Sequence, residues 1–255
     1  MRRFIIENSA PSSGALVITG REARHIRNVL RMKEGEKLLI MDGKGHVFES
    51  TITGIDPRQV LVTINKSISS LPSSPIDITL SQALIKAHPM DYLIQKVTEL
   101  GVNSIAPFYS ERTIIKIKPG HLNNKMGRWM EITKSACKQC GRPVLPSLHP
   151  PVSFEEIIKD SPGNNTLKIL LWEHEHEKDL KTLLQSTNPL PHILPIVGPE
   201  GGFSPNEINL AREAGFHIVS LGNRILRTET AAVSLVSIIQ YEWGDLSIKS
   251  PLLKN

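Results

Sequence analysis

Two glycine-bearing loops, each placed between an apolar segment and the start of a helix, lie close together between Leu194 and Val233. The apolar run 193–197 is continuous, as expected of a strand that is covered on both faces of a sheet. It leads into residues 198–202, Gly-Pro-Glu-Gly-Gly, whose glycines permit positive φ angles and close approach of the backbone to a ligand. A loop between the carboxyl end of a strand and a helix is where open α/β sheets bind ligands.

Helix-start signals follow both loops. After the first loop, Ser204 is placed to cap a helix with a proline in its first turn, and Glu207 can complete a capping box. The second loop, residues 221–231, follows an apolar run at 216–220, and Thr228 is the expected cap of the next helix. Each loop alone could be a tight turn without chemical consequence. Two such loops in tandem, carrying arginine or glutamate, favour a ligand site.

Beyond residue 75 the chain alternates between strand and helix patterns, which predicts an α/β fold with a mostly parallel sheet. A stretch rich in serine and proline at 67–75 predicts a domain boundary. We therefore expect one domain in residues 1–72 and a second in residues 73–255. The elements predicted in the second are strands at 76–80, 102–108, 167–172, 193–197 and 216–220, and helices at 90–100, 122–139, 178–185 and 229–243.

Short alternating apolar runs predict a small antiparallel β-barrel in the N-terminal domain. The predicted strands are 15–18, 37–40, 46–48, 51–53 and 60–64. One helix interrupts them at residues 21–32. Its apolar face consists of Ala23, Ile26, Val29 and Leu30. Arg24, Arg27 and Arg31 fall on another face with no carboxylate between them, which suits contact with phosphate groups. A solvated helix face is the alternative.

The charge balance indicates an anionic partner, because the net charge is +5 and the pI is near 9.2. No apolar run approaches the roughly 20 residues that a membrane span needs. The N-terminal segment has an apolar core too short for a secretory signal. We therefore expect a cytoplasmic protein with no membrane partner.

Two further patterns could indicate a metal site. Cys137 and Cys140 form a CxxC pair, but no second pair exists, which favours two ordinary helix cysteines. In the segment Glu-His-Glu-His-Glu at 173–177, two histidines face the same way if the chain is extended, but spacing identifies no third ligand. We favour a solvated loop there and expect no metal. The first glycine loop reads G-x-x-G-G, and no Gly-Lys-Ser/Thr occurs, so neither a Rossmann nor a P-loop fingerprint is present.

Several segments resemble a known family. GPEGGFSPNE at 198–207 and LGNRILRTETAA at 221–232 together resemble the C-terminal signature of the SPOUT methyltransferases. More narrowly, nearly the whole chain resembles the bacterial family that methylates N3 of a uridine in 16S ribosomal RNA. This resemblance also rests on HIRNVLRMKEGE (25–36), QALIKAHPMDYLIQKVTELGV (82–102), SERT (110–113) and CKQCGRP (137–143). Asn223 departs from the family, which usually has proline there, and residues 87–89 replace a Gly-Asp pattern.

The resemblance implies a fold and a set of partners. It implies a PUA-like β-barrel in residues 1–72 that binds RNA, and a SPOUT α/β methyltransferase domain with a trefoil knot in residues 73–255. It also implies a homodimer, with which a last helix that is apolar around most of its circumference agrees. The implied cofactor is S-adenosyl-L-methionine (SAM). The implied partner is the 16S rRNA of the small ribosomal subunit, modified during ribosome biogenesis.

The resemblance assigns cofactor contacts to three segments. They contain Leu171, Trp172, Glu173, Gly198, Pro199, Glu200, Gly201, Leu221, Gly222, Ile225, Leu226, Thr230 and Ala231. At the methyl-transfer end, Arg227 could stabilise a uracil anion, and Glu200 could orient the cofactor or act as a base. Glu229 is the third catalytic candidate, and a salt bridge between Arg227 and Glu229 is the structural alternative. The candidate RNA contacts are Arg24, Arg27, Arg31, Lys86, Arg112 and Arg142.

Three other functions remain open at this point. The chain could be a SPOUT methyltransferase for another position in ribosomal or transfer RNA. It could be a non-catalytic RNA-binding factor in ribosome assembly that uses the barrel and its arginines. A nicotinamide-dependent oxidoreductase is the least favoured. Binding of SAM without binding of NAD(H) would separate the methyltransferases from the oxidoreductase.

Overall fold

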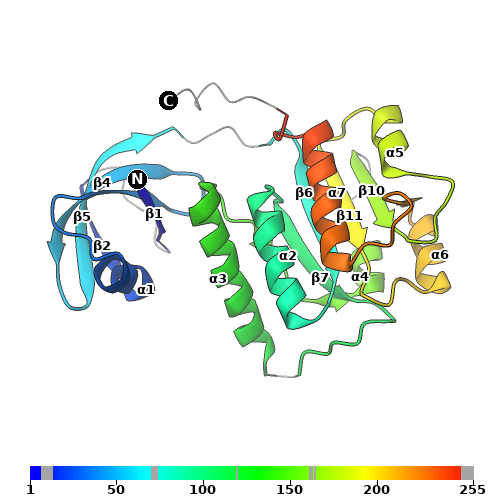
Figure 1. Ribbon diagram of the computed structural model, residues 1–255, viewed down its shortest axis with the longest axis horizontal. Coiled ribbons are helices and arrows are strands. Elements are labelled where there is room, and N and C mark those ends of the chain that lie inside the picture. The colour runs from blue at the N-terminus through cyan, green and yellow to red at the C-terminus, as the bar shows by residue number, and fades with distance from the viewer. Residues whose placement is uncertain (7–13, 70–73, 119, 161–162, 164, 248–255) are drawn as a thin grey trace. The chain divides into compact units, whose positions relative to one another are not determined.

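The computed structural model describes residues 1–6, 14–69, 74–118, 120–160, 163 and 165–247 (Figure 1). The chain forms two compact units. The first comprises Met1–Pro72 and Lys134–Leu145, and the second comprises Ser73–Thr133 and Pro146–Asn255. Helix α3 (Leu122–Cys140) therefore begins in the second unit and ends in the first.

A five-stranded sheet in the order β1-β3-β4-β5-β2 forms the first unit. Its strands are β1 (Arg2–Ile5), β2 (Gly14–Thr19), β3 (Lys37–Met41), β4 (Val47–Ile55) and β5 (Gln59–Ile68). Strand β1 runs parallel to β3, and the other neighbouring pairs are antiparallel. The runs predicted at 46–48 and 51–53 form one strand, β4, which has a register shift between Glu49 and Ser50 and continues past Gly54 after a second shift. Strand β1 was not predicted.

The predicted helix 21–32 is shorter and differently wound than its periodicity indicates. It consists of α1 (Gly20–Arg24) followed by a π-helical turn, η1 (His25–Val29). The wider π turn rotates the following side chains relative to an α-helix. Ala23 and Ile26 are buried as predicted, but Val29 is 69% exposed. The prediction that Val29 lies on the apolar face was therefore wrong.

The C-terminal end of α3 packs within the first unit. The Cys137 side chain is buried against Ile5 and Met41. Arg3 donates to the carbonyl oxygens of Lys138 and Gln139, which α3 leaves unpaired at its end. Burial raises the pKa of the Cys137 thiol to about 12, so this thiol is protonated at neutral pH.

A parallel sheet in the order β12-β10-β11-β6-β7-β8 forms the centre of the second unit. Its longer strands are β6 (Asp77–Ala83), β7 (Ser104–Tyr109), β10 (Thr166–Leu171), β11 (His192–Val197) and β12 (His217–Val219). Two short strands that were not predicted, β8 (Ser147–Leu148) and β9 (Val152–Ser153), both pair with β7. The chain reverses its direction of travel across the sheet after β7, because β10 and β11 lie on the other side of β6. Such a switch point opens a crevice at the carboxyl ends of the strands.

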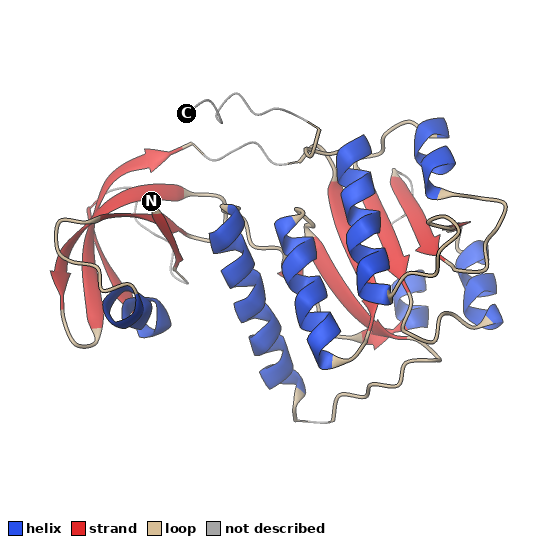
Figure 2. Ribbon diagram, viewed as in Figure 1, coloured by secondary structure: helices blue, strands red, loops and turns tan. Residues whose placement is uncertain are grey.

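Helices cover both faces of this sheet (Figure 2). Helices α2 (Ala87–Glu99), α5 (Leu180–Ser186) and α7 (Thr228–Glu242) pack on one face with the start of α3. Helices α4 (Phe154–Lys159) and α6 (Pro205–Glu213) pack on the other. Successive residues of β10 point to opposite faces, so Ile169 and Leu171 join the first layer and Leu170 joins the second. Burial on both faces explains why these strands read as continuous apolar runs.

Two helix starts test the capping predictions. The capping box of α6 is present as predicted, since Ser204 caps the helix and Glu207 bonds back to the Ser204 backbone. Thr228 is not the cap of α7: Arg227 occupies that position without a side-chain bond, and Thr228 is the first helical residue. The hydroxyl of Thr228 donates instead to the Gly198 carbonyl, on another strand–helix connection.

No helix among the described residues has the length and apolar character needed to cross a membrane. Within the same residues, no group of three or more His, Cys, Asp or Glu side chains is placed to hold a metal ion.

Candidate functional site: a cavity at the carboxyl edge of the parallel sheet

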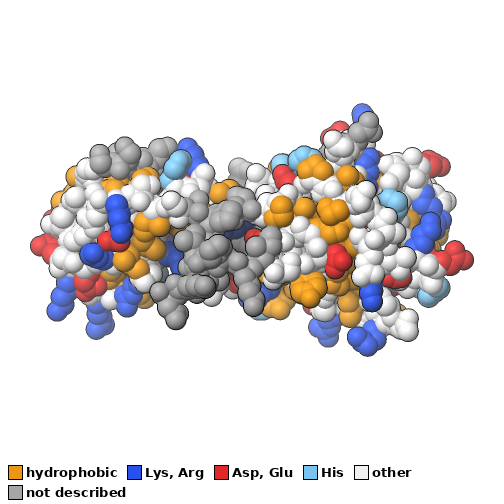
Figure 3. Space-filling view, turned by 90° about the horizontal axis from the view of Figure 1, so that it is seen from above, with side chains coloured by type: hydrophobic (Ala, Val, Ile, Leu, Met, Phe, Trp, Pro, Cys, Tyr) orange, Lys and Arg blue, Asp and Glu red, His pale blue; other side chains and the backbone are white. Residues whose placement is uncertain are grey.

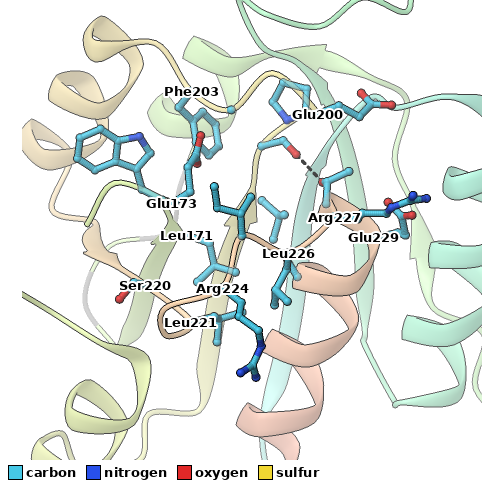
Figure 4. A pocket seen from close by; sticks show the side chains of 18 of the residues that line it. Leu171, Glu173, Glu200, Phe203, Ser220, Leu221, Arg224, Leu226, Arg227 and Glu229 are labelled. Carbon is cyan, nitrogen blue, oxygen red and sulfur yellow. Dashed lines mark hydrogen bonds between the residues drawn. The ribbon is translucent and has the colours of Figure 1, made fainter. Parts of the chain in front are cut away.

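The loops that follow β6, β10, β11 and β12 surround one cavity of about 710 Å³. The contributing segments include residues 171–176, 197–203 and 220–229, so both glycine loops line it. Leu171, Leu221 and Leu226 lie around its centre (Figure 4). The parallel sheet thus brings together, from distant parts of the chain, the segments that the sequence singled out.

A buried hydrogen-bond cluster joins the two glycine loops. The Thr228 hydroxyl donates to the Gly198 carbonyl over 2.6 Å, the bond drawn in Figure 4. The Gln82 side-chain amide donates to the Thr228 hydroxyl over 3.1 Å and lies 3.4 Å from the same carbonyl oxygen. Gln82 is fully buried at the end of β6. The cluster fixes the start of α7 against the loop that follows β11.

A second cluster holds the first glycine loop from the side of β7. The Glu207 carboxylate is fully buried and accepts the backbone N–H groups of Ser204, over 2.9 Å, and Glu111, over 3.0 Å. Arg112 donates to the Gly201 carbonyl over 3.0 Å. The Asn206 side chain donates to the Glu111 carboxylate, and this bond holds the pKa of Glu111 below its ordinary value. The segment Ser-Glu-Arg-Thr at 110–113 is thereby a brace for the cavity loop.

Two glycines permit close packing around the cavity. A Cβ on Gly202, whose φ is +68°, would lie 2.1 Å from a carboxylate oxygen of Glu173. A Cβ on Gly198 would lie 3.0 Å from the ring of Phe203. That ring packs with Phe108 and Phe154 in the core, so it has little room to retreat. Close approach accounts for glycine at Gly198, and close approach together with positive φ accounts for it at Gly202.

The second loop offers free backbone groups and apolar surface to a ligand. No backbone hydrogen bond joins residues 222–226 to any other part of the described chain. Ile225 is 84% exposed, although it belongs to the lining of the cavity. The indole N–H of Trp172, also in the lining, is buried and has no partner among the described residues. An apolar cavity edged by unpaired donors and acceptors is typical of a site for a small organic ligand.

Three charged side chains lie together at one end of the cavity. Arg227 and Glu229 extend from the start of α7, on the same side of the view as Glu200 (Figure 4). The Glu200 carboxylate accepts the backbone N–H of Lys86 over 3.3 Å. In the part of the chain that is described, no carboxylate lies within ion-pair distance of the Arg227 guanidinium. The salt bridge considered as the alternative role of Arg227 and Glu229 is therefore not formed there.

Most residues assigned to the cofactor from the sequence line this cavity. They are Leu171, Trp172, Glu173, Gly198, Pro199, Glu200, Leu221, Gly222, Ile225, Leu226 and Ala231. Gly201 and Thr230 are outside the lining, because Gly201 faces Arg112 and Thr230 is exposed on the first turn of α7. The lining also includes Val197, Phe203, Asn223, Arg224 and Thr228, which the cofactor assignment lacked. All five lie inside or next to the two glycine loops. Assigning every residue of both loops to the site, instead of selected residues, would therefore have predicted more of the lining.

The candidate RNA contacts divide between the two units. Lys86 lines the cavity and Arg112 braces its loop. Arg24 and Arg31 are exposed in the first unit, whereas the half-buried Arg27 donates to the Pro57 carbonyl. Arg142, also in the first unit, is half-buried after α3.

The segment 173–177 forms a turn at the cavity mouth. The Glu175 carboxylate accepts the backbone N–H groups of Glu177, over 2.8 Å, and Lys178, over 3.2 Å. These bonds, that of Glu177 above all, hold the pKa of Glu175 below its ordinary value. His174 packs edge-on against Trp172. The Glu175 carboxylate thus stabilises the turn by accepting these two backbone hydrogen bonds.

Comparison with known protein families matches two consecutive parts of the chain. Residues 72–240 match the family described as an RNA methyltransferase domain, and residues 18–65 match an RNA methyltransferase PUA domain. Ribosomal RNA small subunit methyltransferase E of Buchnera aphidicola subsp. Acyrthosiphon pisum is 32% identical over 95% of this chain and 94% of its own length. The enzyme of the same name from Aquifex aeolicus is 33% identical over 88% and 93%.

Solved structures extend the comparison to three dimensions. A ribosomal RNA small subunit methyltransferase E from Neisseria gonorrhoeae, bound to SAM, is 33% identical and superimposes with a TM-score of 0.88 over 96% of this chain and 99% of its own. A protein from Legionella pneumophila in complex with SAM is 35% identical, with a TM-score of 0.88 over 96% and 98%. The chain therefore belongs to the ribosomal RNA small subunit methyltransferase E family.

Proposed function

We propose that this protein transfers a methyl group from SAM to N3 of a uridine in 16S rRNA. It is a SAM-dependent rRNA methyltransferase. The observation that carries the proposal is the cavity itself: free backbone and apolar surface meet an unpaired arginine and two carboxylates at one end. Membership of the family supports the choice of SAM as cofactor and of small-subunit rRNA as substrate.

The cavity residues divide between two tasks. The unpaired backbone of residues 222–226 and the apolar side chains of Leu171, Ile225 and Leu226 would hold the adenosine. The loop at 198–200 would hold the methionine part. When bound, SAM supplies a methyl group that its sulfonium centre has already activated. The remaining work of the protein is to align the uracil nitrogen with this methyl group and to exclude water.

Uracil N3 carries a proton at neutral pH, so the protein must favour its loss. We assign stabilisation of the resulting negative charge on the uracil oxygens to Arg227, whose guanidinium is unpaired beside the cavity. A positive charge held near a developing anion stabilises it, and the exposed Arg227 side chain would serve this purpose once the bound RNA covers it. Glu200 and Glu229 are the candidate proton acceptors. The hydrogen bond from the Lys86 backbone to Glu200 orients that carboxylate.

The N-terminal domain, residues 1–72, is proposed as a PUA-like barrel that binds RNA. The match of residues 18–65 to an RNA methyltransferase PUA domain supports this role. Lys and Arg side chains also gather along the lower edge of the first unit, at the left of Figure 3. We assign phosphate contacts to Arg24 and Arg31, with Arg27 as a partly buried neighbour. Lys86, Arg112 and Arg142 are proposed to contact RNA as well.

Residues 73–255 are proposed as the SPOUT domain, with a trefoil knot formed by the segments that lead into α7. The proposal includes a cytoplasmic homodimer. Helix α7 supports a partner surface, because Ile238 is 39% exposed and Tyr241 is 64% exposed near its end. Tyr92, on the neighbouring helix α2, is 48% exposed. Light scattering after size exclusion would measure the mass, and a monomer at micromolar concentration would contradict the dimer.

The function is tested by incubating the protein with labelled SAM and small ribosomal subunits that lack this modification. We expect N3-methyluridine at a single position in the 16S rRNA, identified by mass spectrometry of the digested nucleosides. A different methylated nucleoside would keep the methyltransferase but replace the target. Tight RNA binding without transfer would contradict the proposed reaction.

A further inference from the structure

A stretch free of acidic residues covers the later part of the connection from β7 to α3 and the first turns of α3 in the second unit (Figure 1). Residues 113–130 contain Lys116, Lys118, Lys125, Arg128 and His121 but neither aspartate nor glutamate. A positive run of this kind is often a solvated surface with no partner. Whether it forms a binding surface depends on where the side chains lie in the fold.

The basic side chains of this stretch line one hollow of about 370 Å³. Its lining consists of Ile115, Lys116, Ile117, Lys118, His121, Asn124, Lys125 and Arg128. We call this surface the basic hollow. Two elements form it: the extended segment 115–118 and the first turns of α3. Ile117 anchors the extended segment by packing against the main core of the unit, which leaves the neighbouring lysines exposed.

Two of the cations are held in place by neighbouring groups. The Lys125 ammonium lies over the ring of Trp129, 5.5 Å from its centroid. Arg128 donates to the Asp91 carboxylate over 2.6 and 2.9 Å, so its charge is largely balanced. In the described part of the chain, no carboxylate lies within ion-pair distance of Lys116, Lys118 or Lys125. Three positive charges therefore share one concave surface without a neutralising partner.

Some other lysines of this protein do have a carboxylate partner. Lys37 and Lys66 share Glu49, Lys96 pairs with Glu99, and Lys138 pairs with Glu22. Like charges that gather on a concave surface repel one another, and binding of a polyanion removes this repulsion. Among the described residues, the lining of the hollow contains no Phe, Tyr or Trp, and Trp129, under the Lys125 ammonium, is fully buried, so His121 carries the one exposed ring there on which a base could stack.

We propose that the basic hollow binds the sugar-phosphate backbone of the RNA substrate. This inference rests on the proposed function and adds an RNA contact in the catalytic unit. Lys116, Lys118 and Lys125 make the phosphate contacts, and Asn124 contributes a neutral donor at the same surface. Because the contacts are to phosphates, they add affinity without selecting a base sequence.

The test is the salt dependence of RNA binding by the full-length protein. The probe is 16S rRNA transcribed in vitro, and the variant is Lys116→Gln/Lys118→Gln/Lys125→Gln. Each phosphate contact to single-stranded RNA contributes about 0.7 to the slope of log K against log salt concentration, so the slope should fall by about 2. A slope that is lower by about 2 corresponds to an affinity that is lower by about 100-fold at roughly 0.1 M salt. The SAM affinity should not change, since no lysine of the hollow lines the cofactor cavity.

A matched control removes the same charge elsewhere in the second unit. Lys159, Lys178 and Lys181 are exposed; Asp160 follows Lys159, Glu177 and Asp179 flank Lys178, and Asp179 lies two positions before Lys181. The corresponding triple glutamine variant should keep nearly the full slope. Equal losses in both variants would overturn the inference, because net charge alone would then explain them. An unchanged slope in the hollow variant, or a changed oligomer mass with unchanged RNA affinity, would also overturn it. Failure of the unaltered protein to bind RNA would overturn the proposed function as well.

Discussion

The role of Arg227 is inferred from the absence of an ion pair to its guanidinium among the described residues. Its guanidinium lines the cavity, and no carboxylate of the described chain lies within ion-pair distance of it. The unpaired charge beside two carboxylate-bearing residues supports a role toward the substrate.

Replacement of Arg227 by alanine should therefore slow methyl transfer while SAM binding is retained. Loss of one preorganised group that stabilises a developing anion costs about 10²- to 10³-fold in kcat. Single-turnover kinetics would measure the rate, and calorimetry the affinity for SAM. Arg224→Ala is the control, because Arg224 lies on another side of the cavity, away from Glu200 and Arg227 (Figure 4). Equal effects of the two substitutions would leave Arg227 without a specific role.

Alanine substitutions at Gly202 and Gly215 would distinguish the effect of backbone strain from the effect of crowding at the cavity. Both have positive φ, +68° and +82°, so alanine should cost each about 1–2 kcal/mol of unfolding free energy. Only at Gly202 would the new Cβ collide with a side chain, the Glu173 carboxylate. That carboxylate must then move, and Glu173 lines the cavity.

We expect Gly202→Ala to weaken SAM binding by roughly tenfold, about 1.4 kcal/mol, and Gly215→Ala to leave it unchanged. Urea unfolding and SAM titration of both variants would measure the two effects. The explanation fails if the affinity of the Gly202 variant matches that of the Gly215 variant.

At the scale of elements, the contact between α7 and the loop after β11 determines the shape of the cavity. One hydroxyl, that of Thr228, connects the Gly198 carbonyl to the buried Gln82 side chain. The start of α7 carries Arg227 and Glu229, so the same contact places the charged end of the site. Local capping chemistry does not produce this contact, because its partners lie 30 and 146 positions away in the chain.

Thr228→Val should lower both the unfolding free energy and the affinity for SAM. Valine has nearly the same shape, but it leaves the buried Gln82 amide without its acceptor at Thr228 and the Gly198 carbonyl with only the longer bond from Gln82, at a cost of about 1–3 kcal/mol. Thr230→Val is a matched control on the same helical turn, because Thr230 is exposed and does not line the cavity. Chemical unfolding and SAM titration of both variants would decide the matter. Equal stability of the two variants would contradict the proposed role of the hydroxyl.

At the scale of the whole molecule, the cavity and the arginines of the predicted helix 21–32 lie in different units. All residues that line the cofactor cavity belong to the second unit, whereas Arg24 and Arg31 belong to the first. Substitutions in the first unit can therefore change RNA binding without changing the cofactor site.

Arg24→Gln/Arg31→Gln should raise the KM for RNA and lower the salt slope of binding by about 1.4, with unchanged SAM affinity. Arg27→Gln should behave differently, since Arg27 donates to the Pro57 carbonyl and contributes to folding. Filter binding over a salt series and thermal unfolding would separate the two classes. A full salt slope in the double variant would place the RNA contacts of this unit on another surface.

The sequence predicted elements where a local signal determines the structure. The capping box of Ser204 and Glu207 follows from four consecutive residues, and it forms as predicted. The end of α2 at Gly101, whose φ is +89°, follows from the same kind of signal. Predictions were wrong where a distant group changed the outcome, as for Thr228, or where a π turn rotated Val29 into solvent.

The amino-acid sequence by itself determined the alternation of strands and helices and the composition of the two glycine loops, because periodicity and turn chemistry are local properties. Only the tertiary structure decided that these loops share a cavity with residues 171–176, that Glu207 also holds the loop after β7, and that Lys134–Leu145 joins the first unit. These outcomes depend on strand order and on buried side chains finding distant partners. Such pairings are selected by the free energy of the whole fold.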